Sequence, residues 1–203
     1  MKIICIGRNY VAHIREMNND VSSEPVFFMK PDSALVTGNK PFCYPDFSGN
    51  VHHELEVVLR IDRPGRRIDE ESAGRYFNEL ALGVDFTARD LQNKAREKGL
   101  PWEIAKAFDY SAPVSSFLPV SKFRDIHDLS FRLDLNGKTV QEGSTALMIY
   151  SFEKIIAHVS RFISLKTGDQ IFTGTPAGVG PVKPGDRLEA YLEGEKLMDF
   201  PVK

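Results

Sequence analysis

The 203 residues of this sequence are enough for one domain with a substantial hydrophobic core, and we predict a single domain over residues 1–203. Hydrophobic residues at 42% and charged residues at 27% exclude a disordered chain, which would carry fewer apolar residues and more net charge. The formal net charge of -2 gives no electrostatic footprint for nucleic acid or an anionic membrane, so a small-molecule partner stays open.

The two cysteines, Cys5 and Cys43, lie far apart and form no CxxC motif, which argues against a disulfide scaffold and a thiolate zinc site. We expect both to be reduced thiols in the core. The apolar run Ile3–Ile6 is too short for a secretory signal, and no apolar stretch approaches the length of a membrane span. These features predict a cytoplasmic protein.

The first part of the chain combines a strand, a helix and a long loop. Residues 2–7 are predicted to form a buried strand, and residues 9–17 a helix with the apolar stripe Val11, Ile14 and Met17. The polar turn at residues 18–20 ends this helix. Residues 25–45 are predicted to be loop-rich, with Phe27 and Phe28 as buried anchors.

The segment 54–61 alternates with period two. A strand here buries one face and leaves the other to Glu54, Glu56, Val58 and Arg60. After a turn at residues 62–65 we predict a helix at about 70–80 and a second strand at 81–86. Thr87 and Asp90 match a capping box for a helix that stops near Gly99, so Asp85 lies at a strand end beside a helix start.

The second half is predicted to be mostly strands. Residues 108–125 are expected to be irregular, and Asn136-Gly137 joins strands at 131–135 and 139–143 into a hairpin. Ser151 caps a helix, a strand follows at 170–173, and two further strands come after a loop rich in Gly and Pro. Because strands outnumber helices and most connections are hairpin-like, we predict an α+β fold with a largely antiparallel sheet or roll.

Glu54 and Glu56 place two like charges about 7 Å apart on one strand face, where Glu is unfavourable. A solvated strand face is one interpretation. The other adds Asp85, because three carboxylates from two strands form the hard-oxygen set that Mg²⁺ or Mn²⁺ binds. A zinc site at His52 and His53 is disfavoured, since adjacent strand residues point to opposite faces.

His13 and Glu16 are neighbours on a helix, where the carboxylate can fix the imidazole tautomer and raise its basicity, as a general base requires. A surface salt bridge is the simpler interpretation of the same pair. Because Ile14 and Met17 define the buried stripe, residues 9–20 are a candidate mobile lid that orders over a bound ligand.

Two further features carry a structural and a functional interpretation. Lys106 lies in the apolar stretch PWEIAKAFDY, so its ammonium either reaches water or points into a cleft and stabilises a developing oxyanion or enolate. The loop that begins Gly174-Thr175 lacks phosphate-loop motifs, yet its backbone N–H groups and the Thr175 hydroxyl can hold a carboxylate. An ordinary tight turn explains its glycines equally well.

Taken together, these segments resemble the fumarylacetoacetate hydrolase family, and most closely its small single-domain acylpyruvate hydrolases that also decarboxylate oxaloacetate. The resemblance extends from about Ile3 to the last strand and rests on GRNYVAHIREM, EPVFFMKP, HHELEVVLRI, GVDFTARDLQ, KGLPWEIAKAFD, QEGSTALMI and GDQIFTGTPAGVGP. It implies a mixed β-roll with a few peripheral helices, usually a homodimer, that acts on a small 2-oxo acid.

The resemblance implies Glu54, Glu56 and Asp85 as ligands of Mg²⁺ or Mn²⁺. It also implies that His13 and Glu16 form the catalytic dyad of the lid.

For the substrate, the resemblance implies contacts with Arg89 and Gln92, and a carboxylate held by Thr175 and the Gly174 backbone. Lys106 would be the catalytic-site lysine, and Lys30 matches a family position near the site.

The implied activity is Mg²⁺-dependent C–C hydrolysis of acylpyruvates, which are 2,4-diketo acids, or decarboxylation of oxaloacetate. In both reactions a pyruvate enolate would form, stabilised by Mg²⁺ and Lys106, and His13 would activate the water that only hydrolysis needs. Two alternatives stay open. One is an isomerase or decarboxylase of 2-hydroxydienedioates from aromatic-acid degradation, and the other is a non-catalytic divalent-cation binding module.

Overall fold

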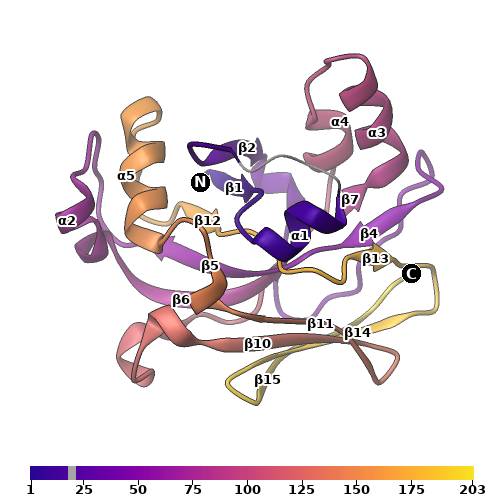
Figure 1. Cartoon of the computed structure of the whole chain (residues 1–203). Coiled ribbons are helices and arrows are strands. Elements are labelled where there is room, and N and C mark those ends of the chain that lie inside the picture. Colours follow the sequence, from indigo (N-terminus) through magenta and orange to yellow (C-terminus); the bar gives the residue numbers. More distant parts are fainter. Residues whose placement is uncertain (18–21) are drawn as a thin grey trace.

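A computed structural model of the protein describes residues 1–17 and 22–203 (Figure 1). The polar turn predicted at residues 18–20, and with it the end of the predicted lid, lies outside the described residues. The α-helices are α1 (Val11–Glu16), α2 (Glu70–Ala73), α3 (Arg89–Glu97), α4 (Glu103–Lys106) and α5 (Phe152–Phe162). Within the described ranges, every helix is too short or too polar to cross a membrane.

The largest sheet has the strand order β2-β1-β12-β5-β6-β9. Its strands are β1 (Ile3–Gly7), β2 (Val26–Lys30), β5 (Leu55–Ile61), β6 (Phe77–Val84), β9 (Leu118–Pro119) and β12 (Gln170–Phe172). β1 and β12 pair in parallel, and the other neighbours pair antiparallel. The prediction of an α+β fold with a largely antiparallel sheet is confirmed.

A second sheet has the order β11-β10-β14-β15, with all pairs antiparallel. Its strands are β10 (Ser130–Leu135), β11 (Lys138–Ser144), β14 (Arg187–Leu192) and β15 (Glu195–Pro201). It lies on one side of β5 and β6, and the helices lie on the other side (Figure 1). The predicted hairpin is present, with Asn136 and Gly137 at φ 54° and 77°, as a type I′ turn requires.

Two small sheets complete the described strands. One joins β13 (Gly180–Pro181), β4 (Val51–His53) and β7 (Thr87–Ala88), and the other joins β3 (Leu35–Val36) to β8 (Ala112–Pro113).

Strand β5 has the two faces that its period-two pattern predicts. Leu55, Val57, Leu59 and Ile61 are fully buried in the main hydrophobic cluster. Val58, on the opposite face, packs in a smaller cluster with Ile3, Cys5, Ala81 and Phe172. Apolar residues therefore cover both sides of the strand that leads into the candidate metal ligands.

Three predicted elements are wrong. The helix at 70–80 ends at Ala73, a 3₁₀ turn spans 74–76, and Phe77 begins β6, because pairing with β5 overrides local helix propensity. Residues 26–30 form β2 rather than a loop, with Phe27 and Phe28 only partly buried. The capping box is also absent, because Thr87 lies in β7 and the Asp90 carboxylate accepts from Ser48 instead, at 2.6 Å.

Of the other local predictions, the helix cap at Ser151 is confirmed, and the burial of Cys43 and Val11 is wrong. Ser151 caps α5, with its Oγ accepting the Lys154 N–H at 3.2 Å, as expected. Cys5 and Cys43 are both free, but Cys43 is exposed rather than in the core. Val11 is also exposed, so Ile14 is the buried residue of α1.

Candidate active site

The three candidate metal ligands meet where β5 begins and β6 ends. Leu55 pairs with Val84, and the Asp85 N–H donates to the carbonyl oxygen of Glu54 at 2.8 Å. Glu54, just before β5, therefore faces Asp85, just after β6, and Glu56 follows on the same strand. Ligand oxygens of the three buried carboxylates lie within 4.8 Å of one another.

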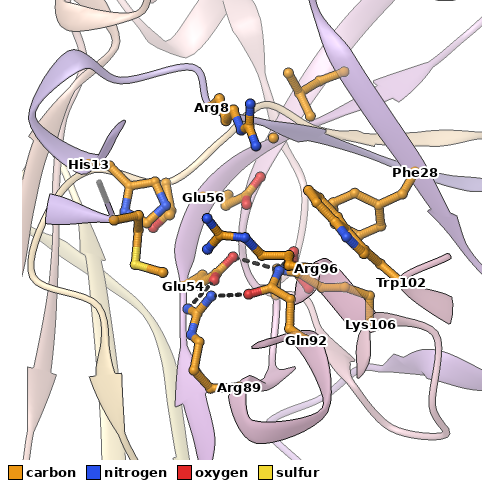
Figure 2. Close-up of a pocket in the computed structure, with 15 residues that line it drawn as sticks. Arg8, His13, Phe28, Glu54, Glu56, Arg89, Gln92, Arg96, Trp102 and Lys106 are labelled. Carbon is orange, nitrogen blue, oxygen red and sulfur yellow. Dashed lines mark hydrogen bonds and ion pairs between the residues drawn. The ribbon is translucent and has the colours of Figure 1, made fainter. Parts of the chain in front are cut away.

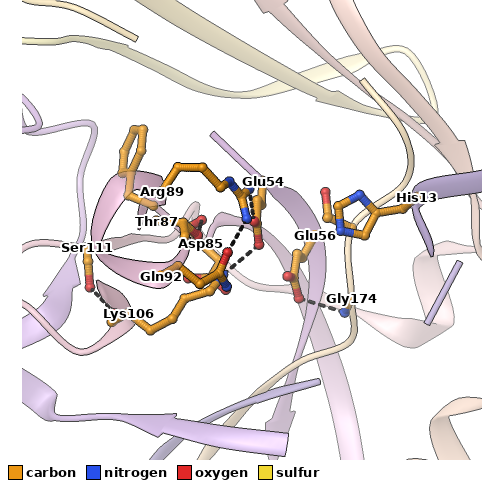
Figure 3. A network of polar contacts seen from close by, with 12 residues as sticks. His13, Glu54, Glu56, Asp85, Thr87, Arg89, Gln92, Lys106, Ser111 and Gly174 are labelled. Carbon is orange, nitrogen blue, oxygen red and sulfur yellow. Dashed lines mark hydrogen bonds and ion pairs between the residues drawn. The ribbon is translucent and has the colours of Figure 1, made fainter. Parts of the chain in front are cut away.

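Three buried cations neutralise most of this charge, and Figure 3 shows two of them, Lys106 and Arg89, beside Glu54. Lys106 Nζ donates to Glu54 Oε2 and to Asp85 Oδ2, both at 2.7 Å. Lys30 Nζ lies 2.8 Å from Asp85 Oδ1, and Arg89 Nη2 donates to Glu54 Oε1 at 2.5 Å. Lys106 is 3% exposed, so the interpretation in which its ammonium reaches water is wrong. Pairing of this kind is what allows charged groups to be buried.

Glu54 and Glu56 respond differently to this environment. Burial acts to raise both pKa values, but the charges of Lys106 and Arg89 hold the pKa of Glu54 well below its ordinary value. Burial, followed by the like charges of Asp85 and Glu54, raises the pKa of Glu56 well above its ordinary value. Glu56 is therefore the carboxylate whose charge the protein compensates least.

The carboxylate cluster fits a divalent cation. Its donors are hard oxygens, the type that Mg²⁺ and Mn²⁺ prefer. The Lys106 ammonium between Glu54 and Asp85 shows that this space accepts a cation, and the like charges of Asp85 and Glu54 beside Glu56 add to its negative potential. An acidic cluster is thus present, and its chemistry matches the predicted metal site.

The predicted dyad is formed on α1. His13 Nδ1 lies 3.2 Å from Glu16 Oε2, and the other Glu16 oxygen accepts the Gly178 N–H at 3.0 Å. Both His13 and Met17 line the cavity that contains the three carboxylates. His13 is therefore part of the site, and Glu16 contacts it from a partly exposed position.

The cavity above the carboxylates holds about 50 Å³ of water-accessible space. Phe28 and Trp102 form one wall, with ring centroids 6.0 Å apart and the rings edge to face (Figure 2). Cationic and amide groups also line it, namely Arg8, Arg89, Gln92, Arg96 and Lys106. The site thus combines an apolar wall with several hydrogen-bond donors.

Sequence reasoning missed Arg8, Arg96 and Trp102. Arg96 follows Arg89 and Gln92 on α3 at i+7 and i+4, so helical spacing was a signal that could have found it. Arg8 has a left-handed backbone, with φ 61°, directly after β1. Such a conformation is uncommon for a residue other than glycine, and nothing in the local sequence predicts it.

Of the remaining predicted residues, Thr175 faces the cavity, whereas Gly174 and Lys30 contact the carboxylate cluster. Thr175 lines the cavity, and the Gly174 N–H is already donated to Glu56 Oε2, at 2.6 Å. The structure therefore places Gly174 as a partner of a candidate metal ligand. Lys30 is fully buried against Asp85 and also donates to Ser111 Oγ at 2.8 Å.

His52 and His53 have different environments, as their positions on one strand predict. His53 Nδ1 lies 2.8 Å from Gln141 Oε1, and burial lowers the pKa of this imidazole. Burial, helped by Arg89, lowers the pKa of His52 to about 4, and its Nε2 lies 3.0 Å from Asn50 Oδ1. The two rings do not converge on one ion.

Comparison with known proteins places this architecture among relatives. The family model described as Fumarylacetoacetate (FAA) hydrolase C-terminal matches residues 2–202. The mitochondrial oxaloacetate tautomerase FAHD1 of Pongo abelii is 47% identical over 201 residues, covering 99% of this chain and 91% of the relative. The mitochondrial oxaloacetate decarboxylase of Dictyostelium discoideum is 40% identical, covering 95% and 89%.

A solved structure shows the same fold. The crystal structure of fumarylpyruvate hydrolase from Pseudomonas aeruginosa, in complex with Mn²⁺ and pyruvate, matches with a TM-score of 0.93 and 38% identity. The match covers 100% of this chain and 90% of that one. With a family model that spans nearly the whole sequence and relatives of this similarity, the chain belongs to the fumarylacetoacetate hydrolase family of enzymes.

Proposed function

We propose that the protein is a Mg²⁺- or Mn²⁺-dependent enzyme of small 2-oxo acids that tautomerises or decarboxylates oxaloacetate and hydrolyses the C–C bond of acylpyruvates. The observation that carries the proposal is the buried carboxylate cluster Glu54, Glu56 and Asp85 in one cavity with His13, whose ring contacts Glu16. The relatives named for oxaloacetate chemistry, and the neighbour bound to Mn²⁺ and pyruvate, support it.

The divalent ion would contribute Lewis-acid activation of the substrate to the reaction. A bound divalent ion would act as a Lewis acid on the carboxylate and 2-oxo oxygens of the substrate. Glu54, Glu56 and Asp85 are the residues that would hold it.

His13 is the proton-transfer group. Its Nδ1 faces the Glu16 carboxylate, which only accepts, so Nδ1 carries the proton and Nε2 is the basic atom. In tautomerisation Nε2 would move a proton at C3 of oxaloacetate, and in hydrolysis it would take a proton from water. The Lys106 ammonium would stabilise the enolate that each reaction forms. Decarboxylation of oxaloacetate and hydrolysis of an acylpyruvate both release the enolate of pyruvate, and the decarboxylation needs no base.

The arginines of the cavity favour oxaloacetate over a neutral acyl group. Arg8, Arg89 and Arg96 line the cavity; in Figure 2 Arg89 and Arg96 lie near Glu54 and Gln92, and Arg8 lies beyond Glu56. Arg8 and Arg96 lie on the cavity lining, and we assign their guanidinium groups to the second carboxylate of a dicarboxylic acid.

The two alternatives fit less well. Relatives named for oxaloacetate chemistry favour a small 2-oxo acid over a longer 2-hydroxydienedioate. A non-catalytic cation site needs no base, whereas His13 is held by Glu16 inside the cavity.

A His13→Gln variant tests the assignment. With Mg²⁺ bound, enol–keto conversion of oxaloacetate and acetylpyruvate hydrolysis should fall by about 10²–10⁴-fold, because both need proton transfer. Pyruvate release from oxaloacetate should fall much less. Equal loss of all three activities, with metal affinity unchanged, would contradict a base role for His13.

We also propose a cytoplasmic homodimer in which residues 1–203 act as one catalytic domain. Two observations support this: both cysteines are free, and the apolar side chains of Phe47 and Ile104 are exposed, 51% and 64%, for a second copy to cover. Light scattering should give twice the mass of the chain, and a monomer at micromolar concentration would contradict the dimer.

A further inference from the structure

Gln141 of β11 is a buried amide that joins several segments around the site. Its Nε2 donates to Thr175 Oγ1 at 2.8 Å and to the Pro176 carbonyl oxygen at 3.1 Å. Its Oε1 accepts the Leu55 N–H at 3.0 Å and lies 2.8 Å from His53 Nδ1. With 1% exposure, this side chain has no access to water as a replacement partner.

Two of these partners fix which way the amide points. A backbone N–H only donates, so the atom that faces Leu55 must be the oxygen of Gln141. A backbone carbonyl only accepts, so the atom that faces Pro176 must be the nitrogen. The orientation therefore follows from the neighbours and not from an arbitrary assignment.

The fixed amide in turn fixes two side-chain protons. His53 Nδ1 faces an oxygen that only accepts, so it must carry the imidazole proton. Thr175 Oγ1 faces a nitrogen that only donates, so the hydroxyl accepts there and its own proton points elsewhere. Thr175 lines the cavity, and the preceding Gly174 N–H is donated to Glu56.

We propose that Gln141 is a positioning residue that makes the Thr175 hydroxyl a hydrogen-bond donor to the substrate carboxylate. This inference rests on the proposed 2-oxo acid chemistry and assigns Gln141 a part in it. Through Leu55 and His53, Gln141 also holds the two neighbours of Glu54 in the chain. One amide therefore sets the position of the carboxylate-binding hydroxyl relative to the candidate metal ligands.

The test replaces Gln141 by the isosteric Glu. A carboxylate can still accept from Leu55 and His53, but it also accepts from the Thr175 hydroxyl and turns that hydroxyl into an acceptor toward the cavity. The Kd of pyruvate, measured by calorimetry with saturating Mn²⁺, should rise at least about tenfold in Gln141→Glu. Thr175→Ser, which keeps the hydroxyl, should bind within about threefold of the original protein.

A double-mutant cycle separates positioning from a merely structural effect. Thr175→Ala should weaken pyruvate binding, and Gln141→Glu should add no further loss in that background. An equal fold-loss from Gln141→Glu with and without the Thr175 hydroxyl would overturn the inference. If the original protein with bound Mn²⁺ fails to bind pyruvate, the proposed function itself fails, which is a distinct outcome.

A second measurement needs no variant. In ¹⁵N NMR spectra of the intact protein, His53 should appear as the neutral Nδ1–H tautomer, because Gln141 Oε1 accepts from that nitrogen. An Nε2–H tautomer would reverse the amide and overturn the donor role of Thr175.

Discussion

Glu56 and Glu54 are two residues apart, yet their pKa values are shifted in opposite directions. Lys106 and Arg89 both contact Glu54, whereas Glu56 receives the Gly174 N–H. At the scale of single residues, the protein's own cations therefore compensate Glu54 more than Glu56, and a divalent ion would offset the like charges around Glu56.

Replacing Glu56 by Gln tests this uneven neutralisation. The metal-free variant should unfold at a higher temperature than the metal-free original, because a buried group beside two like charges is removed. Its Mn²⁺ affinity should fall at least about 100-fold, since even loss of a partner outside the ligand set costs about 10–100-fold. Thermal unfolding with and without Mn²⁺ measures both effects.

Glu79→Gln on β6 is the matched control, because Glu79 pairs with Arg60 away from the cavity. It should keep the full stabilisation by Mn²⁺. An equal stabilisation of Glu56→Gln would contradict a role for Glu56 as a ligand.

A variant at Arg96 tests whether the site prefers a dicarboxylic acid as its substrate. In Arg96→Gln the KM for oxaloacetate should rise at least about tenfold, because a guanidinium contact to a carboxylate is lost, while the KM for acetylpyruvate should change little. Lys94→Gln removes a charge from an exposed position of the same helix and serves as the control. A matching rise for both substrates in Arg96→Gln would assign Arg96 to a contact that they share.

The sequence predicts the carboxylate cluster because Glu54 and Glu56 break the pattern of a buried strand and Asp85 ends the next predicted strand. It does not predict the hydrogen bonds that the Gly174 N–H and the Gln141 amide make beside the cluster. The Gly174 N–H donates to Glu56 Oε2 at 2.6 Å, and Gln141 Oε1 accepts the Leu55 N–H at 3.0 Å. In both bonds the two residues are more than 80 positions apart in the sequence. Only the folded chain reveals such pairs.

At the scale of elements, helix α1 is held to the glycine-rich loop through one hydrogen bond. The Gly178 N–H donates to Glu16, and Gly178 has φ +96° with an added Cβ only 2.2 Å from the Val140 carbonyl oxygen. The loop can approach β11 this closely only with glycine at this position.

Gly178→Ala should therefore displace the loop and release Glu16. We expect a loss of roughly 1–3 kcal/mol beyond that of Gly185→Ala, together with slower oxaloacetate tautomerisation. Gly185 is a matched control because it has the same φ of +96° and open space around an added Cβ. Denaturant unfolding compares the two variants, and equal losses would show that backbone strain alone, not the contact with Val140, requires glycine at position 178.

Elements with a local signal are predicted well, and elements that depend on partners are not. The Asn136-Gly137 hairpin and the Ser151 cap follow from their own residues. Residues 77–80 become a strand because Leu80 pairs with Leu59 and Phe77 with Ile61 in β5, which no window around residue 80 contains.

At the scale of the whole molecule, strand directions explain why distant segments share one site. In the large sheet, β1 and β12 are parallel, and β5 is antiparallel to both β12 and β6. The side of the sheet where β5 begins is therefore the side where β1, β12 and β6 end. Arg8, Gly174, Asp85 and Glu54 lie at these four strand ends. The sheet topology therefore assembles the candidate metal ligands, the glycine-rich loop that begins at Gly174 and a cavity arginine from sequence segments that are far apart.

The central claim is tested most directly by measuring pyruvate release. The metal-stripped protein is assayed with and without added Mg²⁺, on oxaloacetate and on acetylpyruvate in parallel. The account predicts pyruvate from oxaloacetate that depends on Mg²⁺, with acetylpyruvate cleaved by the same site. No pyruvate from either substrate while the ion is bound, or equal rates without the ion, would contradict it.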